Sequence, residues 1–393
     1  MGRGTRKVGV AERRARLAVR HHLASGERAV TVTAAAADII GLHGTDPASV
    51  YLAAWARTRE IDRAAIEHAL YEERSLVRML GMRRTVFVVP ASLEPVIQAA
   101  CTDQIAERMA RRLAQQVEES GIAPDGASWL KAAGEATVRA LAARGTATGA
   151  ELARDEARLR AQIIYASGKS YGGSANVTTR LLTLLSAQGL IVRGRPRGGW
   201  TSSQFTWSAV RDQARPTEPA AARAELARRW LSAFGPALAD DLQWWAGWTA
   251  GQVRQALAQL DLAQVDLDGA PGIMLAADEP VPVAEPWAAL LPALDPTAMG
   301  WRERAWYVGE HGPALFDRSG NIGPTAWWDG RIVGGWAQRQ DGEIAVRLLE
   351  DAGAEAAAAV AAEAGRLREW IGSDPKTRIT PRFRTPLERE LSS

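Results

Sequence analysis

The chain has 393 residues, of which 47% are hydrophobic and 24% charged, a composition that excludes a disordered protein and predicts about two to four packed domains. Its single cysteine, Cys101, excludes an intrachain disulfide framework and a cysteine-based metal site, and we expect it to be a small buried residue in a reducing, cytoplasmic setting. The basic N-terminus lacks the apolar stretch of a secretory signal, and no apolar run is long enough to span a membrane.

Two basic clusters underlie the small net charge of +3. Within residues 1–20, Glu12 is the single acidic residue beside seven basic ones, namely Arg3, Arg6, Lys7, Arg13, Arg14, Arg16 and Arg20. The second cluster is Arg193, Arg195 and Arg197, with no acidic residue inside it. Such clusters favour binding to a polyanion such as nucleic acid, although the first cluster also fits a solvated tail.

Residues 30–90 predict three helices followed by a two-stranded ribbon, which is the order of a winged helix. With a preceding amphipathic helix, the expected elements are helices at 9–24, 33–41, 47–57 and about 62–73, and strands at 76–80 and 84–89. Asp62 is a typical N-cap for the last helix, and Gly81 separates the two strands.

The pattern restarts after a helical connection over residues 91–120. A helix is expected at 127–143, and Thr148 with Glu151 forms a capping box that begins another helix. A turn rich in glycine, arginine and proline then predicts the second wing, with strands at 190–193 and 204–207.

Residues 174–188 predict the helix of this second unit that reads DNA. Its apolar face consists of Val177, Leu181, Leu184 and Leu185, and its polar face of Asn176, Thr179, Arg180 and Thr183. A packed face opposite a face of this polar composition suits the major groove of DNA. The preceding Gly172-Gly173 predicts a tight turn, with phosphate binding as the alternative.

A third copy is indicated by internal repetition. The pattern Gly-x-Ala-x-x-x-acid-Leu at residues 145–152 recurs at residues 235–242, and a helix at 249–259 then ends the third set of helices. We therefore expect a tandem array of winged helices, located at residues 30–90, 127–210 and 221–280.

The C-terminal part changes to a β-rich pattern. Residues 325–333 predict two strands joined by Asp329-Gly330, a strong hairpin signal, and further strands are expected at 337–340 and 344–349 before a helix at about 353–371. The expected fold class is mainly α with small β hairpins (α+β). The expected domains are the first winged helix with its leading helix and connector (1–120), the second (121–215), the third (216–285) and the β-rich part (286–393).

Several segments, in this order along the chain, resemble the AlkZ-like (AlkZ/YcaQ) family of winged-helix DNA glycosylases. They are residues 41–47 (GLHGTDP), 84–90 (RTVFVVP), 193–194 (RG), 290–295 (LLPALD) and 329–336 (DGRIVGGW). The resemblance implies three tandem winged helices and a β-rich C-terminal part around a concave DNA-binding channel. The reaction that it implies is hydrolysis of the N-glycosidic bond of bulky N-alkylated purines, which in some members protects antibiotic producers from their own alkylating products.

The catalytic motif of that family is Gln-Φ-Gln or Gln-Φ-Asp, with Φ usually aliphatic, and the matching positions here are His43, Gly44 and Thr45. An N7-alkylated guanine is cationic and leaves without a general acid, so the site needs to place a water and stabilise a positive sugar. We expect His43 to orient or deprotonate the water, Thr45 to hold it, and Asp46 to supply negative charge. The structural alternatives are a helix cap for His43 and an ordinary N-cap before Pro47 for Asp46.

Contacts to DNA are expected from the second wing, from the 174–188 helix and from other basic positions. The predicted residues are Arg83, Arg84, Lys169, Asn176, Arg180, Arg193, Arg195, Arg197 and Trp200. The alternatives are a solvated hairpin tip for the wing arginines and an anchoring role for Trp200. The histidines have no metal-ligand spacing, so no metal or other cofactor is expected.

The leading hypothesis is a monofunctional DNA glycosylase that acts as a monomer on double-stranded DNA carrying alkylated purines, with no protein partner and no membrane contact. The alternative is a non-enzymatic winged-helix DNA-binding protein, either a transcription factor or a damage sensor. Regulators usually bind paired half-sites as dimers, whereas three units in one chain favour wrapping around a single site. Release of free base from an alkylated duplex distinguishes the two hypotheses.

Overall fold

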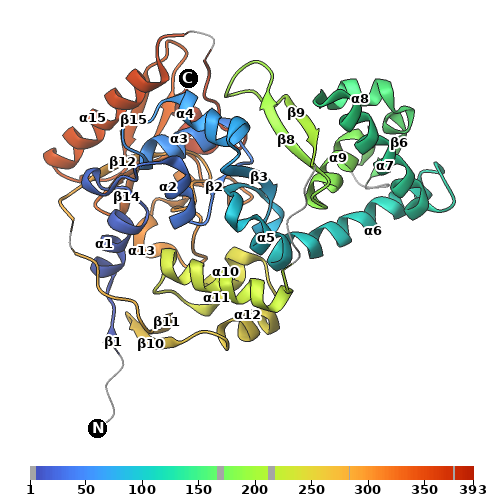
Figure 1. Ribbon diagram of the computed structural model, residues 1–393. Helices are drawn as coiled ribbons and strands as arrows, with labels where there is room; N and C mark the ends of the chain where they lie inside the picture. Colours follow the sequence, from blue (N-terminus) through green and yellow to red (C-terminus); the bar gives the residue numbers. More distant parts are fainter. Residues whose placement is uncertain (1–5, 166–171, 211–216, 283, 375–376) are drawn as a thin grey trace.

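The computed structural model describes residues 6–165, 172–210, 217–282, 284–374 and 377–393 (Figure 1). One large hydrophobic core draws its residues from 17–101 and 222–391 together with Trp200, and a second core draws on residues 113–207. The chain therefore forms a main body and a separate lobe, and Figure 1 shows the lobe beside the main body, connected through α6 (Asp103–Glu119).

The first unit contains the expected helices and ribbon and one additional short strand. In chain order its elements are α2 (Val32–Asp38), β2 (Leu42–His43), α3 (Pro47–Arg57), α4 (Arg63–Glu67) with a π turn (His68–Glu72), β3 (Leu76–Leu80) and β4 (Val86–Pro90). Its strands form a sheet in the order β2-β4-β3. α3 is buried on all sides, which explains its run of apolar and small residues.

The same order of elements recurs in the lobe and again in the main body. In the lobe it is α7 (Gly126–Arg144), β5 (Ala147–Thr148), α8 (Gly149–Asp155), α9 (Thr178–Ala187), β8 (Ile191–Pro196) and β9 (Phe205–Ala209), with strand order β5-β9-β8. In the third unit it is α10 (Pro219–Phe234), the bridge residue Ala237, α11 (Ala239–Ala246), α12 (Ala250–Leu257), β10 (Leu262–Leu267) and β11 (Ala270–Leu275). This repetition is what the winged-helix prediction requires, while the domain limits stay a prediction.

The lobe differs from the prediction between α8 and α9. Residues expected to begin the DNA-reading helix instead form β7 (Gly173–Asn176), which pairs with β6 (Gln162–Tyr165). The side chains of Ser174 and Asn176 form hydrogen bonds with Gln162 on the paired strand, which stabilises a hairpin over a further helical turn. The prediction of a helix from residue 174 is therefore wrong, and α9 begins at Thr178.

Most of the described basic side chains of the N-terminal cluster form contacts within the main body. In α1 (Val10–Arg20), Arg16 forms a salt bridge with Asp278 at 2.8 Å, and the Arg13 guanidinium lies over the Trp306 ring, 4.1 Å from its centroid. These partners lie next to the third unit and in the C-terminal part, so α1 joins those two regions. Neither a solvated tail nor a free DNA-binding arm describes this helix.

The C-terminal part is an antiparallel four-stranded sheet covered by helices. Its strands are adjacent in chain order, β12 (Ala288–Leu291), β13 (Thr325–Trp328), β14 (Arg331–Gln338) and β15 (Ile344–Leu348). The predicted Asp329-Gly330 turn is confirmed, with positive φ at both residues. The expected helix is α15 (Ala354–Ile371), whereas α16 (Pro386–Leu391), which packs on β14, was not predicted. Among the described residues, no helix has both the length and the apolar character needed to cross a bilayer.

A buried polar network attaches α3 to the C-terminal part. Arg57 and Asp295 are fully buried and form a two-pronged salt bridge, with N–O distances of 2.8 and 2.5 Å. The Thr297 hydroxyl accepts a hydrogen bond from Arg57 and donates one to Nδ1 of His21, whose Nε2 donates to the carbonyl of Ala233. Burial lowers the pKa of His21 well below its usual value, so this ring is neutral.

Candidate nucleic-acid interface

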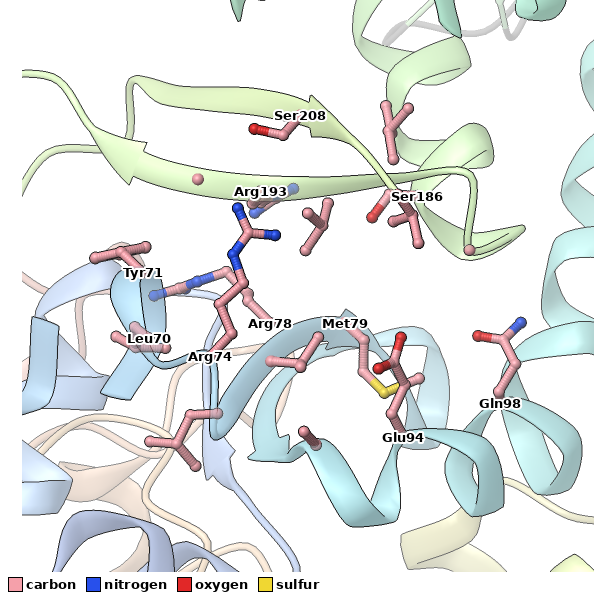
Figure 2. A pocket seen from close by; sticks show the side chains of 18 of the residues that line it. Leu70, Tyr71, Arg74, Arg78, Met79, Glu94, Gln98, Ser186, Arg193 and Ser208 are labelled. Atoms are coloured by element: carbon pink, nitrogen blue, oxygen red, sulfur yellow. The ribbon is translucent and has the colours of Figure 1, made fainter. Parts of the chain in front are cut away.

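A cleft of about 820 Å³ separates the main body from the lobe (Figure 2). Its floor comes from β3 and neighbouring residues of the first unit, and its roof comes from the β8–β9 hairpin. The charged residues that line it are Arg74, Arg78, Arg193, Arg195 and Arg197 on the one hand and Glu72, Glu94 and Asp103 on the other. Because guanidinium groups outnumber carboxylates, the cleft favours a polyanion.

Two of the predicted wing arginines are engaged in ion pairs. Arg195 contacts Glu67 and Glu72 of the first unit, the latter at 3.1 Å, so it attaches the wing to the main body. Arg197 pairs with Glu151 of its own lobe at 2.8 Å. Exposed ion pairs of this kind contribute little to stability, so DNA phosphates can replace these carboxylates.

Trp200 anchors the wing to the main body. Its side chain is only 8% exposed, with the rings of Tyr51 and Trp370 at centroid distances of 5.3 and 5.8 Å. Stacking of a base on Trp200 is not available in this arrangement, because both neighbouring rings occupy its surroundings. The anchoring alternative therefore describes this residue.

The adjacent residues Arg83 and Arg84 have different environments. Both have left-handed backbone, with φ of 50° and 58°. The Arg83 guanidinium lies over Trp244 of α11, 3.9 Å from the ring centroid, and burial lowers its pKa to about 10. Arg83 thus joins the first and third units, whereas Arg84 is exposed and has no ion-pair partner among the described residues.

The predicted DNA-reading face of the lobe is largely used for internal contacts. Asn176 accepts a hydrogen bond from Gln162 across the β6–β7 hairpin. Arg180 donates to Gln116 of α6 at 3.0 Å and lies over the ring of Tyr165. The free polar face that was expected for this helix is therefore not present at Arg180. Lys169 and, in the N-terminal cluster, Arg3 lie outside the described residues.

The motif segment that begins at His43 lies at the edge of the first sheet. His43 is opposite Phe87 of β4, and the Gly44 N–H donates to the carbonyl of Val86 at 2.7 Å. The His43 side chain is 4% exposed and packs edge-on against Phe87, with 5.2 Å between ring centroids. The ring is therefore buried rather than free in an open turn, because His43 belongs to a strand that is paired with β4.

Arg78 connects this motif to the cleft. It lines the cleft, is buried, and donates from Nη1 to the carbonyl of Gly44 at 2.6 Å. A Cβ at position 44 would lie 3.3 Å from that nitrogen, so glycine permits the close approach of Arg78 rather than of a substrate backbone. His43, Thr45 and Asp46 do not themselves line the cleft.

The protonation state of His43 restricts its chemistry. Burial, together with the charge of Arg83, lowers its pKa to about 3, so the ring is neutral at physiological pH and is a poor general base. The Thr45 N–H points at Nδ1 at 3.5 Å, which assigns the hydrogen of the neutral ring to Nε2. Within the described parts of the chain, Nε2 of His43 and the Thr45 hydroxyl have no hydrogen-bond partner.

Asp46 has a structural position. Its Oδ1 accepts the Ala48 N–H as the N-cap of α3, and its Oδ2 accepts the N–H of Arg382, both at 3.2 Å. Burial raises the pKa of this carboxyl. The N-cap alternative therefore describes Asp46, which also attaches the C-terminal segment to the first unit.

The buried neutral histidines predict a loss of stability in acid. An unfolded histidine gains a proton near pH 6.5, whereas folded His43 gains one only near pH 3. Below about pH 6.5 the unfolded chain therefore binds more protons, and the free energy of unfolding falls by about 1.4 kcal/mol per pH unit for each such group. The fully buried His21 acts in the same direction.

Denaturant titrations at pH 7 and pH 5 on the wild type and on His43→Gln measure this effect. The glutamine variant is expected to lose about 2 kcal/mol less than the wild type between these pH values. Asp46 and Asp241, whose pKa values are raised by burial, act in the opposite direction but are present in both proteins. An equal loss in the two proteins would show that His43 titrates normally in the folded state.

The sequence and the fold match a known family. The family model described as DNA glycosylase AlkZ-like matches residues 36–370, which is most of the chain. The chain belongs to the AlkZ-like DNA glycosylase family. Among solved structures, the Streptomyces sahachiroi DNA glycosylase AlkZ is similar, with a TM-score of 0.68 and 21% identity, covering 91% of this chain and 97% of that chain. No curated protein shows a significant match to the sequence.

Membership in the AlkZ-like family assigns the chain to the DNA glycosylases, with DNA as the substrate. The cleft contains residues that the sequence analysis missed, above all Tyr71, Arg74 and Arg78. The available signal for Arg78 was a charged residue inside the apolar strand Leu76–Leu80, because a buried charge is rare unless it has a partner or a role. Arg74 and Tyr71 carry no such signal.

Proposed function

We propose that this AlkZ-like protein removes bulky N-alkylated purines, such as N7-alkylguanine adducts, from double-stranded DNA as a monofunctional glycosylase. Self-resistance to a DNA-alkylating natural product is the role that we propose for this activity. The observation that carries the proposal is the family match over residues 36–370, together with a cleft in which basic residues outnumber acidic ones beside the motif position.

The proposed chemistry uses no protein acid. The bond between the sugar C1′ and the purine nitrogen breaks, and both electrons pass to the cationic base, which leaves neutral. A water oxygen then bonds to C1′ of the oxocarbenium ion and gives its proton to solvent. β2 ends at His43 and the chain bends at Thr45, whose N–H points at Nδ1 of His43, so the two residues lie close together. The Nε2–H of neutral His43 and the hydroxyl of Thr45 are the groups that hold this water.

Base release is the decisive measurement. The protein is incubated with a duplex that carries one N7-alkylguanine with a bulky substituent, and free base is quantified by mass spectrometry. Enzyme-dependent release with strand breakage appearing only after alkali supports a monofunctional glycosylase. The same duplex without the adduct is the control.

One observation favours the non-enzymatic alternative, namely the double departure from the family motif at His43 and Thr45, with a ring at position 43 that is a poor base. A transcription factor or damage sensor needs only the DNA-binding cleft. Tight binding to the alkylated duplex without base release would support this alternative and contradict the glycosylase proposal.

Binding to DNA is predicted to depend strongly on salt through the wing. Replacement of Arg193, Arg195 and Arg197 together by alanine removes the basic wing, and three lost phosphate contacts flatten the slope of log K against log salt by up to about 2.7. Fluorescence anisotropy with an undamaged duplex at several salt concentrations measures the slope. The control is Arg228→Gln, an exposed residue of α10 paired with Glu225 outside the cleft. An unchanged slope in the triple variant would show that the wing arginines form contacts only within the protein and none with DNA.

A further inference from the structure

The Arg78 side chain is buried and only partly hydrogen-bonded. Its Nη1 holds the carbonyl of Gly44, but Nε and Nη2 have no hydrogen-bond partner among the described residues. The Tyr71 hydroxyl lies beside this guanidinium and beside the Tyr51 hydroxyl, and it forms a hydrogen bond of normal geometry with neither. Buried donors without acceptors are costly, so their presence indicates that an acceptor binds here.

A second guanidinium group lies in the same part of the cleft. Arg78 and Arg193 both stack on the ring of Phe205, with centroid distances of 4.8 and 5.2 Å. No described residue forms a salt bridge with either side chain. Burial lowers the pKa of Arg193 to about 10, and the charge of Arg78 adds to this effect. Two like charges held on one aromatic ring without a counterion form a site for an anion.

A third guanidinium group, that of Arg74, extends from the floor of the cleft toward the hairpin that carries Arg193, as Figure 2 shows. Arg74 is exposed and forms no ion pair within the described part of the chain. The Asp46 carboxylate interacts electrostatically with Arg78, but its oxygens already accept hydrogen bonds from two backbone N–H groups. The cluster is therefore not neutralised from within the main body.

We propose that Arg74, Arg78 and Arg193, with the Tyr71 hydroxyl, bind one backbone phosphate of the DNA. The inference rests on the proposed function, because it assumes that DNA occupies the cleft. Guanidinium groups present paired N–H donors that match phosphate oxygens, and stacking on Phe205 preorganises two of them. Arg78 is then a positioning residue: one edge binds the phosphate while Nη1 holds Gly44, so DNA binding fixes the segment that carries His43 and Thr45.

A scan with uncharged phosphate analogues tests the site directly. A duplex with a central, stable abasic-site analogue, which fixes the binding register, is synthesised as a series in which one phosphate at a time is replaced by a neutral methylphosphonate, and affinities are measured by anisotropy. For the wild type, one position is expected to weaken binding by about tenfold to a hundredfold. In Arg78→Gln and in Arg193→Gln, that position is expected to lose its effect, while effects at other positions persist.

The controls separate the possible failures. Arg228→Gln is expected to reproduce the wild-type scan, because Arg228 does not line the cleft. Arg193→Gln serves as the second variant if Arg78→Gln fails to fold, since Arg193 is half-buried and forms no side-chain hydrogen bond with any described residue. If DNA binds but no position is coupled to Arg78 or Arg193, the phosphate site is overturned and the glycosylase proposal stands. If no DNA binds at all, the proposed function itself fails.

Discussion

Replacing Asp295 with alanine is expected to lower the free energy of unfolding by about 3–5 kcal/mol, because it leaves the Arg57 guanidinium charged and fully buried without its partner. The loss includes the support of Thr297, which forms hydrogen bonds with both Arg57 and His21. Unfolding in guanidinium chloride, followed by tryptophan fluorescence, measures the effect. We expect a lower denaturant concentration at the midpoint and an unchanged slope of free energy against denaturant concentration.

The matched control for Asp295→Ala is an exposed ion pair of the same chemical type. Glu390 pairs with Arg347 at 2.5 Å, and both side chains are about half exposed, so Glu390→Ala is expected to cost less than about 1 kcal/mol. Similar losses in the two variants would mean that burial adds nothing to the cost of breaking the Arg57 pair.

Replacing His43 with alanine is expected to reduce base release by about 10²- to 10³-fold, because it removes the Nε2–H donor that we propose for the attacking water. Binding to DNA is expected to change little, since the cleft supplies the phosphate contacts. Since the pKa of His43 is about 3, its titration leaves the rate unchanged between pH 5 and pH 8. Single-turnover release from the alkylated duplex measures both expectations.

Two further variants locate the chemistry of the motif. His43→Gln provides an amide donor at the position where the family motif has glutamine, so its loss is expected to stay within about tenfold. Thr45→Ala is expected to lose less than His43→Ala, because the vacated space still admits a water. Normal base release by His43→Ala would return His43 to a structural role, in agreement with its packing against Phe87.

Elements with strong local signals were predicted correctly from the sequence. The capping box at Thr148 and the turn at Asp329-Gly330 both lie where the sequence indicates, because side chain and backbone within four residues decide each of them. The predicted start of α9 was wrong because the residues before Thr178 form β7 and pair with β6. This pairing, which includes Gln162, joins residues that are not adjacent in sequence.

The candidate site was harder to predict than the fold. The position of the motif at His43 follows from the sequence, but its burial depends on the register with Phe87, and the pKa follows from that burial. The wing was recognised as basic, yet the acids that bind Arg195 belong to another unit more than a hundred residues away in sequence. Pairings over such distances have no local sequence signal.

The separate core of the lobe has a consequence for how the protein unfolds. The chain leaves the main body near Asp103 and returns near Thr217, and both residues line the same cleft, so the lobe is an insertion whose two connections are neighbours. Of the 15 tryptophans, only Trp129 and Trp207 belong to the core of the lobe. Tryptophan emission therefore reports mainly the main body, whereas circular dichroism at the helical bands reports both bodies. Non-coincident curves from these two probes would mark independent melting of the insertion rather than a folding intermediate of the whole chain.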